Sequence, residues 1–487
     1  MKTTRRLLAV VLTVIMVMSL ATTAFAAEDD GYTITINGTA GHTYEVYQIF
    51  TGDLSGNVLS NIVWGDGVSA DGQTALGDAA TVAESITDAK AFAASIDQYL
   101  TNPKTMTEND GTYTLSGLEA GYYLIKDKDN SQEGESGTYT AYILKVVKDV
   151  TATPKDSVPT VDKKINDAGD ADVADYNIGD KIDFTLTATL GDNLDQYEKY
   201  YVVFHDTMSA GLTYNNDAVV KVDGNTVTEG VTVKYENNKL TVTIADAKAL
   251  GAKDGSKITV EYTATLNSGA VVGGEGNPNT VKLEYSNDPN VDYDGDPTTP
   301  PPTGDTPEDT VVVFTFELDV TKVDGEDATK KLSGAEFKLK NEEGKWVTID
   351  ANGKVTGWET DEANGSTLTS DANGFFKISG LEDGTYYLKE TKAPEGYNLL
   401  TAEIKIVITS TYDETGVKTL KIKVDNGEEK SGNTTNGVVE TTVENNQGAT
   451  LPETGGMGTT LFYILGGILM VGAAVLLVTK RRMNMAE

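Results

Sequence analysis

Three polar side chains fall on strand faces that are otherwise apolar, although they lie far apart in the 487-residue sequence. Alternate residues of a β-strand share a face, so Lys322 in the segment Leu318–Lys322 points the same way as its apolar neighbours. By the same parity, Glu390 and Asn445 lie on the apolar faces of their own segments. Burying an amine, a carboxyl and an amide costs free energy unless they interact, so we expect the three groups to meet.

An earlier stretch of the chain repeats this pattern. Lys163, Asp206 and Asn287 each alternate with apolar residues on one strand face. In both sets the lysine belongs to the first strand, the acid lies in the middle and the amide comes near the end. Parity leaves open whether Lys163 or Lys164 points inward, and which nearby asparagine takes part.

Such a triplet is suited to forming an amide bond between lysine and asparagine. Desolvation lowers the pKa of an amine and raises that of a carboxyl, so a neutral amine and a protonated acid coexist. The amine attacks the asparagine carbonyl while the acid polarises it and transfers protons, releasing ammonia, and contact in a dry core supplies the effective concentration. The alternative is a lysine that extends to solvent beside an unrelated carboxylate. The predicted bonds are Lys163–Asn287, promoted by Asp206, and Lys322–Asn445, promoted by Glu390.

The segments that carry these residues read as β-strands. Many runs alternate apolar with polar residues, are rich in Thr, Val and Tyr, and end at Gly or Asn. Only Ala79–Leu100 has a helical pattern. We therefore expect an all-β protein.

The length predicts about three domains at ~150 residues each. Tyr113–Leu124 matches Phe376–Leu388 with one insertion, so two related domains flank a different one. This match puts Lys126 at the place of Glu390, and the opening strand Tyr32–Ile36 has no lysine, so no bond is expected in the first domain. The expected division is 1–26, a signal peptide; 27–155, an N-terminal domain; 156–316, a middle domain; 317–447, a C-terminal domain; and 448–487, a sorting segment.

The two ends are apolar. A basic start, the apolar run Leu7–Leu20 and the small residues Ala24–Ala26 are typical of a secretory signal peptide. At the other end an apolar run, Leu461–Val478, is long enough to span a membrane and precedes a basic tail.

The composition excludes several classes of function. The formal net charge of −35 opposes binding to nucleic acid. The chain has no cysteine and only two histidines, His42 and His205, so zinc and classical hydrolase sites are not expected, and neither is a cofactor. The acidic run Asp292–Asp296 is expected to be a solvated loop, because its spacing does not fit an EF-hand. A calcium site there is the alternative.

The C-terminal segment resembles the sorting signal of Gram-positive surface proteins. This resemblance implies that a sortase cleaves between Thr454 and Gly455 and passes the Thr454 carbonyl to an amine. The motif consists of Leu451, Pro452, Glu453, Thr454 and Gly455.

The whole chain resembles the sortase-assembled major pilins of the SpaA/FimA kind. Leu388–Tyr397 is similar to the pilin E-box, with Glu390 as its acid, and the sequence around Lys322 is similar to the first strand of a CnaB-type immunoglobulin-like domain. The segments around Asp206 and Asn287 resemble the CnaA-like domain of these pilins. The implied fold is an elongated array of tandem immunoglobulin-like β-sandwiches.

The resemblance also implies an acceptor lysine at the end of the first domain. Lys155 occupies the matching position, although Thr153 replaces the tyrosine usual in that motif, and Lys148 is the nearest competitor. The implied function is a pilus shaft subunit joined from Thr454 to Lys155, not an enzyme. Its expected partners are pilus-specific and housekeeping sortases, further copies of itself, minor pilins and peptidoglycan. The alternative is a singly anchored adhesin or tip pilin that binds a host or bacterial surface ligand.

Overall fold

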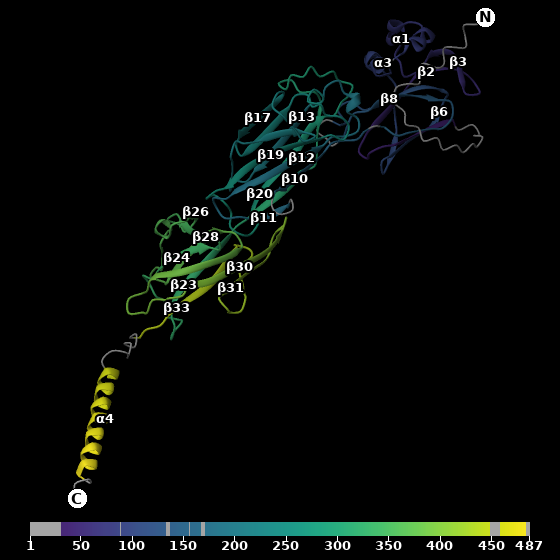
Figure 1. Ribbon diagram of the computed structural model, residues 1–487. Helices are drawn as coiled ribbons and strands as arrows, with labels where there is room; N and C mark the ends of the chain where they lie inside the picture. The colour runs from purple at the N-terminus through teal and green to yellow at the C-terminus, as the bar shows by residue number, and fades with distance from the viewer. Residues whose placement is uncertain are drawn as a thin grey trace. The chain divides into compact units, whose positions relative to one another are not determined.

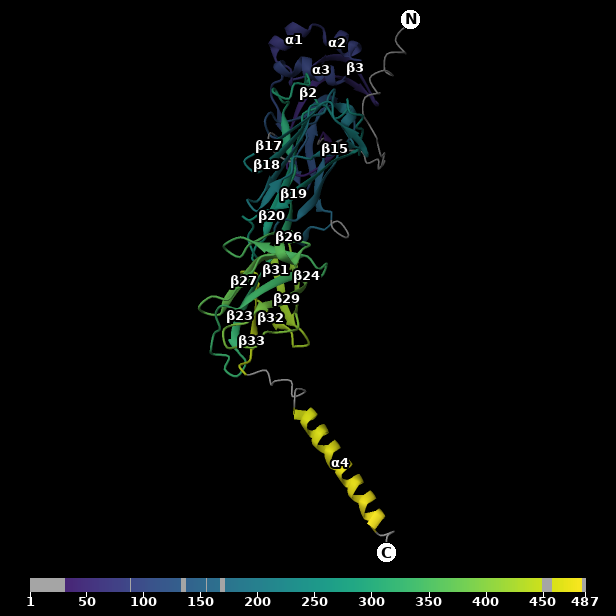
Figure 2. The same cartoon turned by 60° about the vertical axis from the view of Figure 1, so that its left-hand side comes forward.

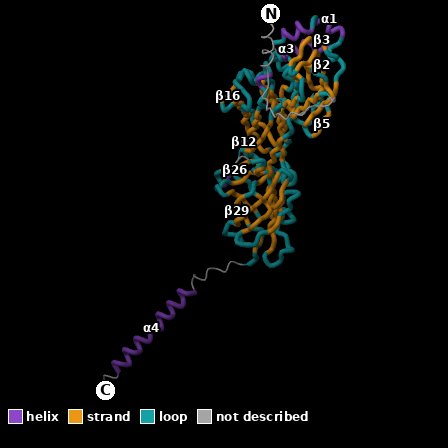
Figure 3. The backbone as a smooth tube through the Cα atoms, turned by 90° about the vertical axis from the view of Figure 1, so that its right-hand side faces the viewer, coloured by secondary structure: helices purple, strands orange, loops and turns teal. Residues whose placement is uncertain are grey.

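The computed structural model describes residues 31–87, 89–132, 137–154, 156–166, 171–448 and 458–483. Strands dominate these residues, and a long helix lies near the C-terminal end (Figure 1). The tube in Figure 3 makes the predominance of strand over helix plain. The all-β expectation is confirmed, whereas the expected signal peptide lies outside the described residues.

The chain divides into two compact units. The first extends to Thr315 and includes Thr411–Lys418, while the second contains Phe316–Ser410 and the chain from Thr419 onward. The extended run Thr310–Asp324 is interrupted at Thr315, because one strand ends at Phe314 and the next begins at Phe316. The first unit holds two β-sandwiches and the second holds one, here called the first, middle and third sandwich.

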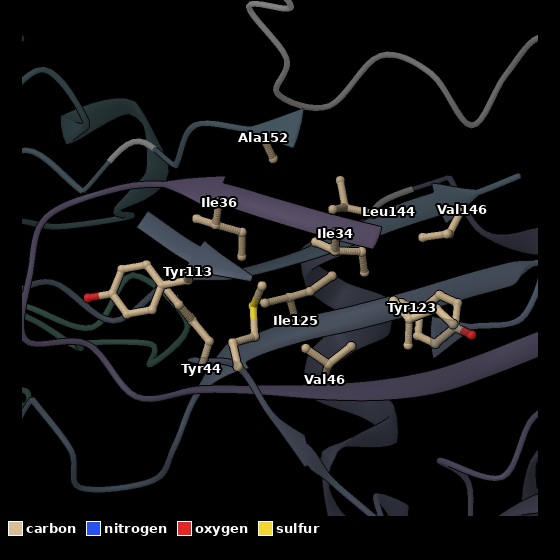
Figure 4. Packing of buried hydrophobic residues seen from close by; sticks show 12 residues of the cluster. Ile34, Ile36, Tyr44, Val46, Tyr113, Tyr123, Ile125, Leu144, Val146 and Ala152 are labelled. Atoms are coloured by element: carbon tan, nitrogen blue, oxygen red, sulfur yellow. The ribbon is translucent and has the colours of Figure 1, made fainter. Parts of the chain in front are cut away.

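The first sandwich packs two sheets around an apolar core. Ile34 and Ile36 of one sheet face Val46 and Ile125 of the other, and all four are buried (Figure 4). One sheet has the order β5 (Thr107–Asn109), β6 (Thr112–Leu118), β1 (Tyr32–Asn37) and β9 (Val150–Ala152). The other has the order β3 (Val58–Trp64), β2 (Tyr44–Ser55), β7 (Gly121–Asp127) and β8 (Ala141–Val146), with β4 (Lys104–Thr105) paired to β2.

Short helices gather beside β2 and β3 (Figure 2). They are α1 (Ala70–Leu76), α2 (Ala79–Ser85), α3 (Ala89–Ile96) and the 3₁₀ turn η1 (Asp97–Tyr99). The helical pattern expected from Ala79 is present, but α1 was not expected. Ser69 caps α1 by accepting a hydrogen bond from the Gly72 amide, a signal too local to show as periodicity.

The middle sandwich also has two sheets. One has the order β10 (Thr160–Ile165), β12 (Lys181–Thr189), β19 (Lys257–Leu266), β15 (Val219–Val222) and β16 (Asn225–Val227), with β14 (Leu212–Tyr214) paired to β19. The other has the order β11 (Val173–Asp175), β22 (Asp309–Phe314), β20 (Asn277–Ser286), β13 (Val202–Met208), β18 (Lys239–Ile244) and β17 (Val231–Glu236), with β21 (Thr303–Asp305) paired to β20.

The third sandwich pairs its first and last strands. Its small sheet has the order β28 (Phe375–Leu381), β23 (Phe316–Asp324) and β33 (Val438–Asn445), and β23 and β33 run parallel. The larger sheet has the order β26 (Val355–Glu359), β25 (Trp346–Ile349), β24 (Glu336–Asn341), β29 (Gly384–Lys392), β30 (Ile404–Asp413), β31 (Gly416–Val424) and β32 (Lys430–Ser431), with β27 (Leu368–Thr369) paired to β24.

Helix α4 (Gly458–Met483) follows the third sandwich in sequence. Its segment Tyr463–Arg481 has a mean hydropathy of 2.0 and is long and apolar enough to cross a membrane. This helix agrees with the apolar span expected from the sequence.

Candidate functional site

Lys322, Glu390 and Asn445 meet in the core of the third sandwich, and all three are buried. The Lys322 Nζ lies 4.0 Å from Glu390 Oε1 and donates a hydrogen bond to the Val443 carbonyl at 3.0 Å. The Asn445 Nδ2 donates to Glu390 Oε2 at 3.0 Å. The structure thus brings together an amine, a carboxyl and an amide that the sequence separates widely.

Strand register explains this meeting. In the parallel β23–β33 pair, Lys322 is opposite Val443 and Asp324 is opposite Asn445, so the lysine and the asparagine are one pleat apart on neighbouring strands. Side chains two residues apart point to the same face, so both enter the core. Glu390 comes from β29 in the facing sheet and closes the site from the other side.

Burial affects the ionisation of the amine in this site. It lowers the pKa of Lys322 to about 8, against the opposing charges of Glu390 and Glu444. Within the described residues, Glu390 Oε1 and Asn445 Oδ1 are buried with no hydrogen-bond donor. Leaving such acceptors unpaired costs ~1–3 kcal/mol each, a cost that any donor reaching these oxygens would reduce.

The middle sandwich holds a second buried lysine. Lys163 and Asp206 are fully buried, and the Lys163 Nζ donates to Asp206 Oδ1 and to the Tyr262 hydroxyl, the latter at 3.1 Å. The Tyr262 hydroxyl donates to Asp206 Oδ2 and accepts a hydrogen bond from Asn279 Nδ2 at 2.7 Å. Burial lowers the pKa of Lys163 to about 8, although the Asp206 charge opposes this. An amine, an acid and an amide therefore meet here as well.

The amide in this second site is Asn279, whereas the sequence pointed to Asn287. Between β13 and β20, Met208 is opposite Asn279 and Val202 is opposite Tyr285, so Asn287 lies beyond the far end of the pairing. Residues 279 to 287 of equal parity share one face, and a period of two cannot separate them. Asn279 could have been identified only from the register of β20 against β13, the strand that carries Asp206.

Asn287 is buried in other contacts. Its Nδ2 donates to the Gln132 carbonyl at 2.7 Å, and its own carbonyl accepts from the Tyr139 amide at 2.6 Å. Lys164, the alternative to Lys163, is partly exposed and pairs with Asp162 at 3.1 Å and with Asp172. Neither Asn287 nor Lys164 faces the buried acid.

The first sandwich retains the acid of this pattern. Tyr123 and Tyr386 each donate to the carbonyl oxygen four residues earlier, at 2.9 and 2.8 Å, so the internal repeat aligns without an insertion. Asp127, four residues after the first of these tyrosines, therefore occupies the place of Glu390. The expectation that Lys126 stands there is wrong.

Asp127 pairs with a histidine instead of a lysine. Its carboxylate accepts from His42 Nδ1 at 2.8 Å and from the Thr140 amide at 2.7 Å, and both partners of the ion pair are buried. Burial lowers the pKa of His42, but the hydrogen bond and charge of Asp127, with a contribution from Asp156, raise it above its ordinary 6.5 overall. An ion pair thus stands where the third sandwich has its triplet.

Several residues expected to act lie outside the described residues. These are Lys155 and the motif residues Leu451, Pro452, Glu453, Thr454 and Gly455. Lys148, the competing acceptor, is described and exposed. Among the described residues no group of three His, Asp or Glu side chains is arranged to hold a metal ion.

Comparisons with known proteins place these sites in context. Residues 172–289 match the Gram-positive pilin backbone subunit 2, Cna-B-like domain; residues 316–426 match the SpaA prealbumin-like fold domain; and residues 443–484 match the LPXTG cell wall anchor motif.

Two curated proteins and one solved structure are similar over much of the chain. The trypsin-resistant surface T6 protein of Streptococcus pyogenes serotype M6 is 25% identical over 94% of this chain and 96% of its own. The fimbrial subunit type 1 of Actinomyces viscosus is 26% identical over 69% and 66% of the two chains. The structure of the T6 backbone pilin, with three domains, covers 88% of this chain and 100% of its own with a TM-score of 0.57 at 20% identity, which supports the fold.

Proposed function

We propose that sortase polymerises this chain into a covalent shaft and that two internal amide bonds stiffen each subunit. The chain belongs to the LPXTG-anchored backbone pilins of Gram-positive bacteria. As a cell wall-anchored surface pilin, it is a structural protein rather than an enzyme. The proposed domains are residues 27–155, 156–316 and 317–447.

The joint between subunits uses Thr454, which follows the third domain, and Lys155, at the end of the first domain. Sortase cleaves after Thr454 and transfers its carbonyl to the Lys155 amine of the next copy, while α4 and its basic tail hold the precursor at the membrane until cleavage. The match to the anchor motif supports this step. Minor pilins join the same shaft, and peptidoglycan receives the last subunit.

The internal bonds join Lys322 to Asn445 and Lys163 to Asn279. The observation that carries this proposal is a buried lysine beside a buried acid and a buried asparagine, found twice. With a pKa near 8, each amine has an appreciable neutral fraction near pH 7, which attacks the amide carbon. Glu390 or Asp206 takes the amine proton, which is passed on to the amide nitrogen, and that nitrogen leaves as ammonia. The amide formed is uncharged, so it removes the cost of burying the lysine charge.

Each bond closes a ring of about 120 residues. The chain-entropy relation derived for disulfides gives roughly 5 kcal/mol of stabilisation for a ring of this size. Unlike a disulfide, the amide is not reducible, which suits a chain that is exported without cysteine.

Intact mass spectrometry of recombinant residues 27–450 tests these bonds. We expect the wild type to weigh less than its sequence by two ammonia molecules, and Lys163→Ala or Lys322→Ala to restore one ammonia each beyond the substitution itself. Asn279→Ala restores one ammonia, whereas the matched control Asn287→Ala keeps both bonds. A wild-type mass equal to that of the unmodified chain would disprove internal cross-linking.

The adhesin alternative makes a different prediction for Lys155. A shaft subunit needs an acceptor lysine, so Lys155→Ala abolishes the ladder of polymers that survives boiling in detergent, while Lys148→Ala, a control at a nearby exposed lysine, leaves it intact. Wild-type cells that show only a single anchored species support the adhesin.

A further inference from the structure

The hydroxyl of Tyr262 lies among the three reacting groups of the middle site. It is 3.1 Å from Lys163 Nζ, it accepts a hydrogen bond from Asn279 Nδ2 at 2.7 Å, and it donates to Asp206 Oδ2. The reaction of the lysine, the acid and the asparagine does not by itself require this side chain.

The third site shows what the hydroxyl replaces. There the carboxyl acts directly, because Asn445 Nδ2 donates to Glu390 Oε2 at 3.0 Å while Oε1 faces the amine. In the middle site the acid is an aspartate, one methylene shorter. Its Oδ1 faces Lys163, and its Oδ2 receives the hydrogen bond of Tyr262. The chain of hydrogen bonds from carboxyl to amide nitrogen therefore runs through the tyrosine.

We propose that Tyr262 is a catalytic residue of the middle site, which relays a proton from Asp206 to the departing nitrogen of Asn279. This inference rests on the proposed Lys163–Asn279 bond.

The proton balance closes without a further reactant. The neutral Lys163 Nζ forms a bond to Asn279 Cγ, and Asp206 Oδ1 takes one of its protons. The Asp206 carboxyl then turns so that the proton it has taken lies toward Tyr262. It passes this proton to the Tyr262 oxygen as the hydroxyl, turned from Asp206 to Nδ2, gives its own proton to Nδ2. The Cγ–Nδ2 bond then breaks, ammonia leaves, and both Asp206 and Tyr262 return to their starting states.

The surroundings of Tyr262 suit this role. Burial, followed by the nearby Asp206 charge, raises its pKa well above the ordinary value of 10, so the hydroxyl keeps its proton between transfers. The ring is stacked on Phe184 with centroids 5.4 Å apart and meets Tyr214 edge-on at 5.8 Å. This packing holds the hydroxyl in place through the two transfers.

Tyr262→Phe removes the hydroxyl and keeps the ring. In pulse-chase synthesis of the mature chain, followed by intact mass and peptide mapping, we expect the middle bond to form about 10²-fold more slowly or to be absent. The third bond forms at the wild-type rate in the same molecules, since its site has no such tyrosine, and so serves as the internal reference for the rate. Tyr214→Phe is the matched control, because its hydroxyl accepts from the Ala218 amide outside the site.

A second variant separates chemistry from packing. Asp206→Glu in the Tyr262→Phe background lengthens the acid so that it reaches Asn279 directly, as Glu390 reaches Asn445, and we expect it to recover the middle bond. A wild-type rate in Tyr262→Phe overturns the relay, and so does an equal loss in Tyr262→Phe and Tyr214→Phe. A wild-type chain without a middle bond would instead overturn the cross-link on which the relay rests.

Discussion

At the scale of the residue, the lysines were predictable and one of their partners was not. Parity along a strand identified Lys322 as inward-facing and limited the middle lysine to Lys163 or Lys164, because a lysine that alternates with apolar residues does not fit the pattern of a solvated face. It failed for Asn279, since every second residue from Asn279 to Asn287 satisfies the same rule. Tyr262 escaped notice because an inward tyrosine is ordinary in a β-sandwich core.

His42 provides a prediction on pH at this scale. Besides Asp127, the groups facing it are Tyr44, which stacks on its ring, Tyr113, whose hydroxyl accepts from the His42 amide, and Asp156. Because its folded pKa is raised above 6.5, the ion pair contributes stability that is fully present below pH 6.5. That contribution is lost as pH rises through the folded pKa.

An imidazole NMR titration of the mature chain measures this directly. The chain has only two histidines, so a His205→Gln background leaves one titrating signal. We expect its midpoint above 6.5, and we expect Asp127→Asn to move it below 6.5, because burial then acts without the opposing charge. A midpoint that does not respond to Asp127→Asn contradicts the ion pair.

At the scale of the element, the two proposed bonds constrain different things. The bond from β23 to β33 joins neighbouring strands of one sheet, whereas the bond from β10 to β20 joins strands of opposite sheets. The alternation of apolar and polar residues predicted the strand positions, but it did not predict the correct alignment of β7 with β29. Leu124 and Ile125 are both buried, since the helices cover the outer face of that sheet, and the loss of alternation disguised the match to β29.

The β23–β33 bond predicts a selective loss of stability. Asn445→Ala removes the electrophile, and we expect the third sandwich to lose at least about 5 kcal/mol of unfolding free energy, the entropic value of the ring. Tryptophan fluorescence in urea follows this unfolding, because Trp346 and Trp358 lie in the third sandwich, Trp64 in the first and none in the middle one.

The matched control is Asn279→Ala, which breaks the other bond in a sandwich without tryptophan. It should leave the transition of Trp346 and Trp358 in place. An Asn445→Ala transition that coincides with that of the wild type would mean that the bond adds no stability there.

At the scale of the whole molecule, the order of the bonds along the chain defines which residues carry tension. In the proposed shaft, force entering at Lys155 would pass across the bond from Lys163 to Asn279, continue along the backbone to Lys322, and cross to Asn445 before leaving at Thr454. The first sandwich is bypassed, as are the strands inside each ring. The only long unprotected segment runs from Asn279 to Lys322 and contains most of β20, with β21, β22 and the start of β23.

Single-molecule stretching between Lys155 and Thr454 tests this path. We expect that segment, about 40 residues long, to release at most about 150 Å of contour length, and the interiors of the two rings to release none. The Lys163→Ala variant, which opens the middle ring, adds the residues between Lys163 and Asn279 to the released length. Full extension of the wild-type chain would rule out this load path.

The parallel pairing of β23 with β33 has a kinetic consequence. These strands come from opposite ends of the third sandwich, and the Lys322 to Val443 contact spans 121 residues. Contacts between residues so far apart in the sequence form slowly, because the chain must first close a long loop. Once the proposed amide exists, β23 and β33 stay tethered whenever the third sandwich unfolds, so this long loop has to be closed only once. The first folding of the sandwich is therefore the slow one, and each later refolding is faster.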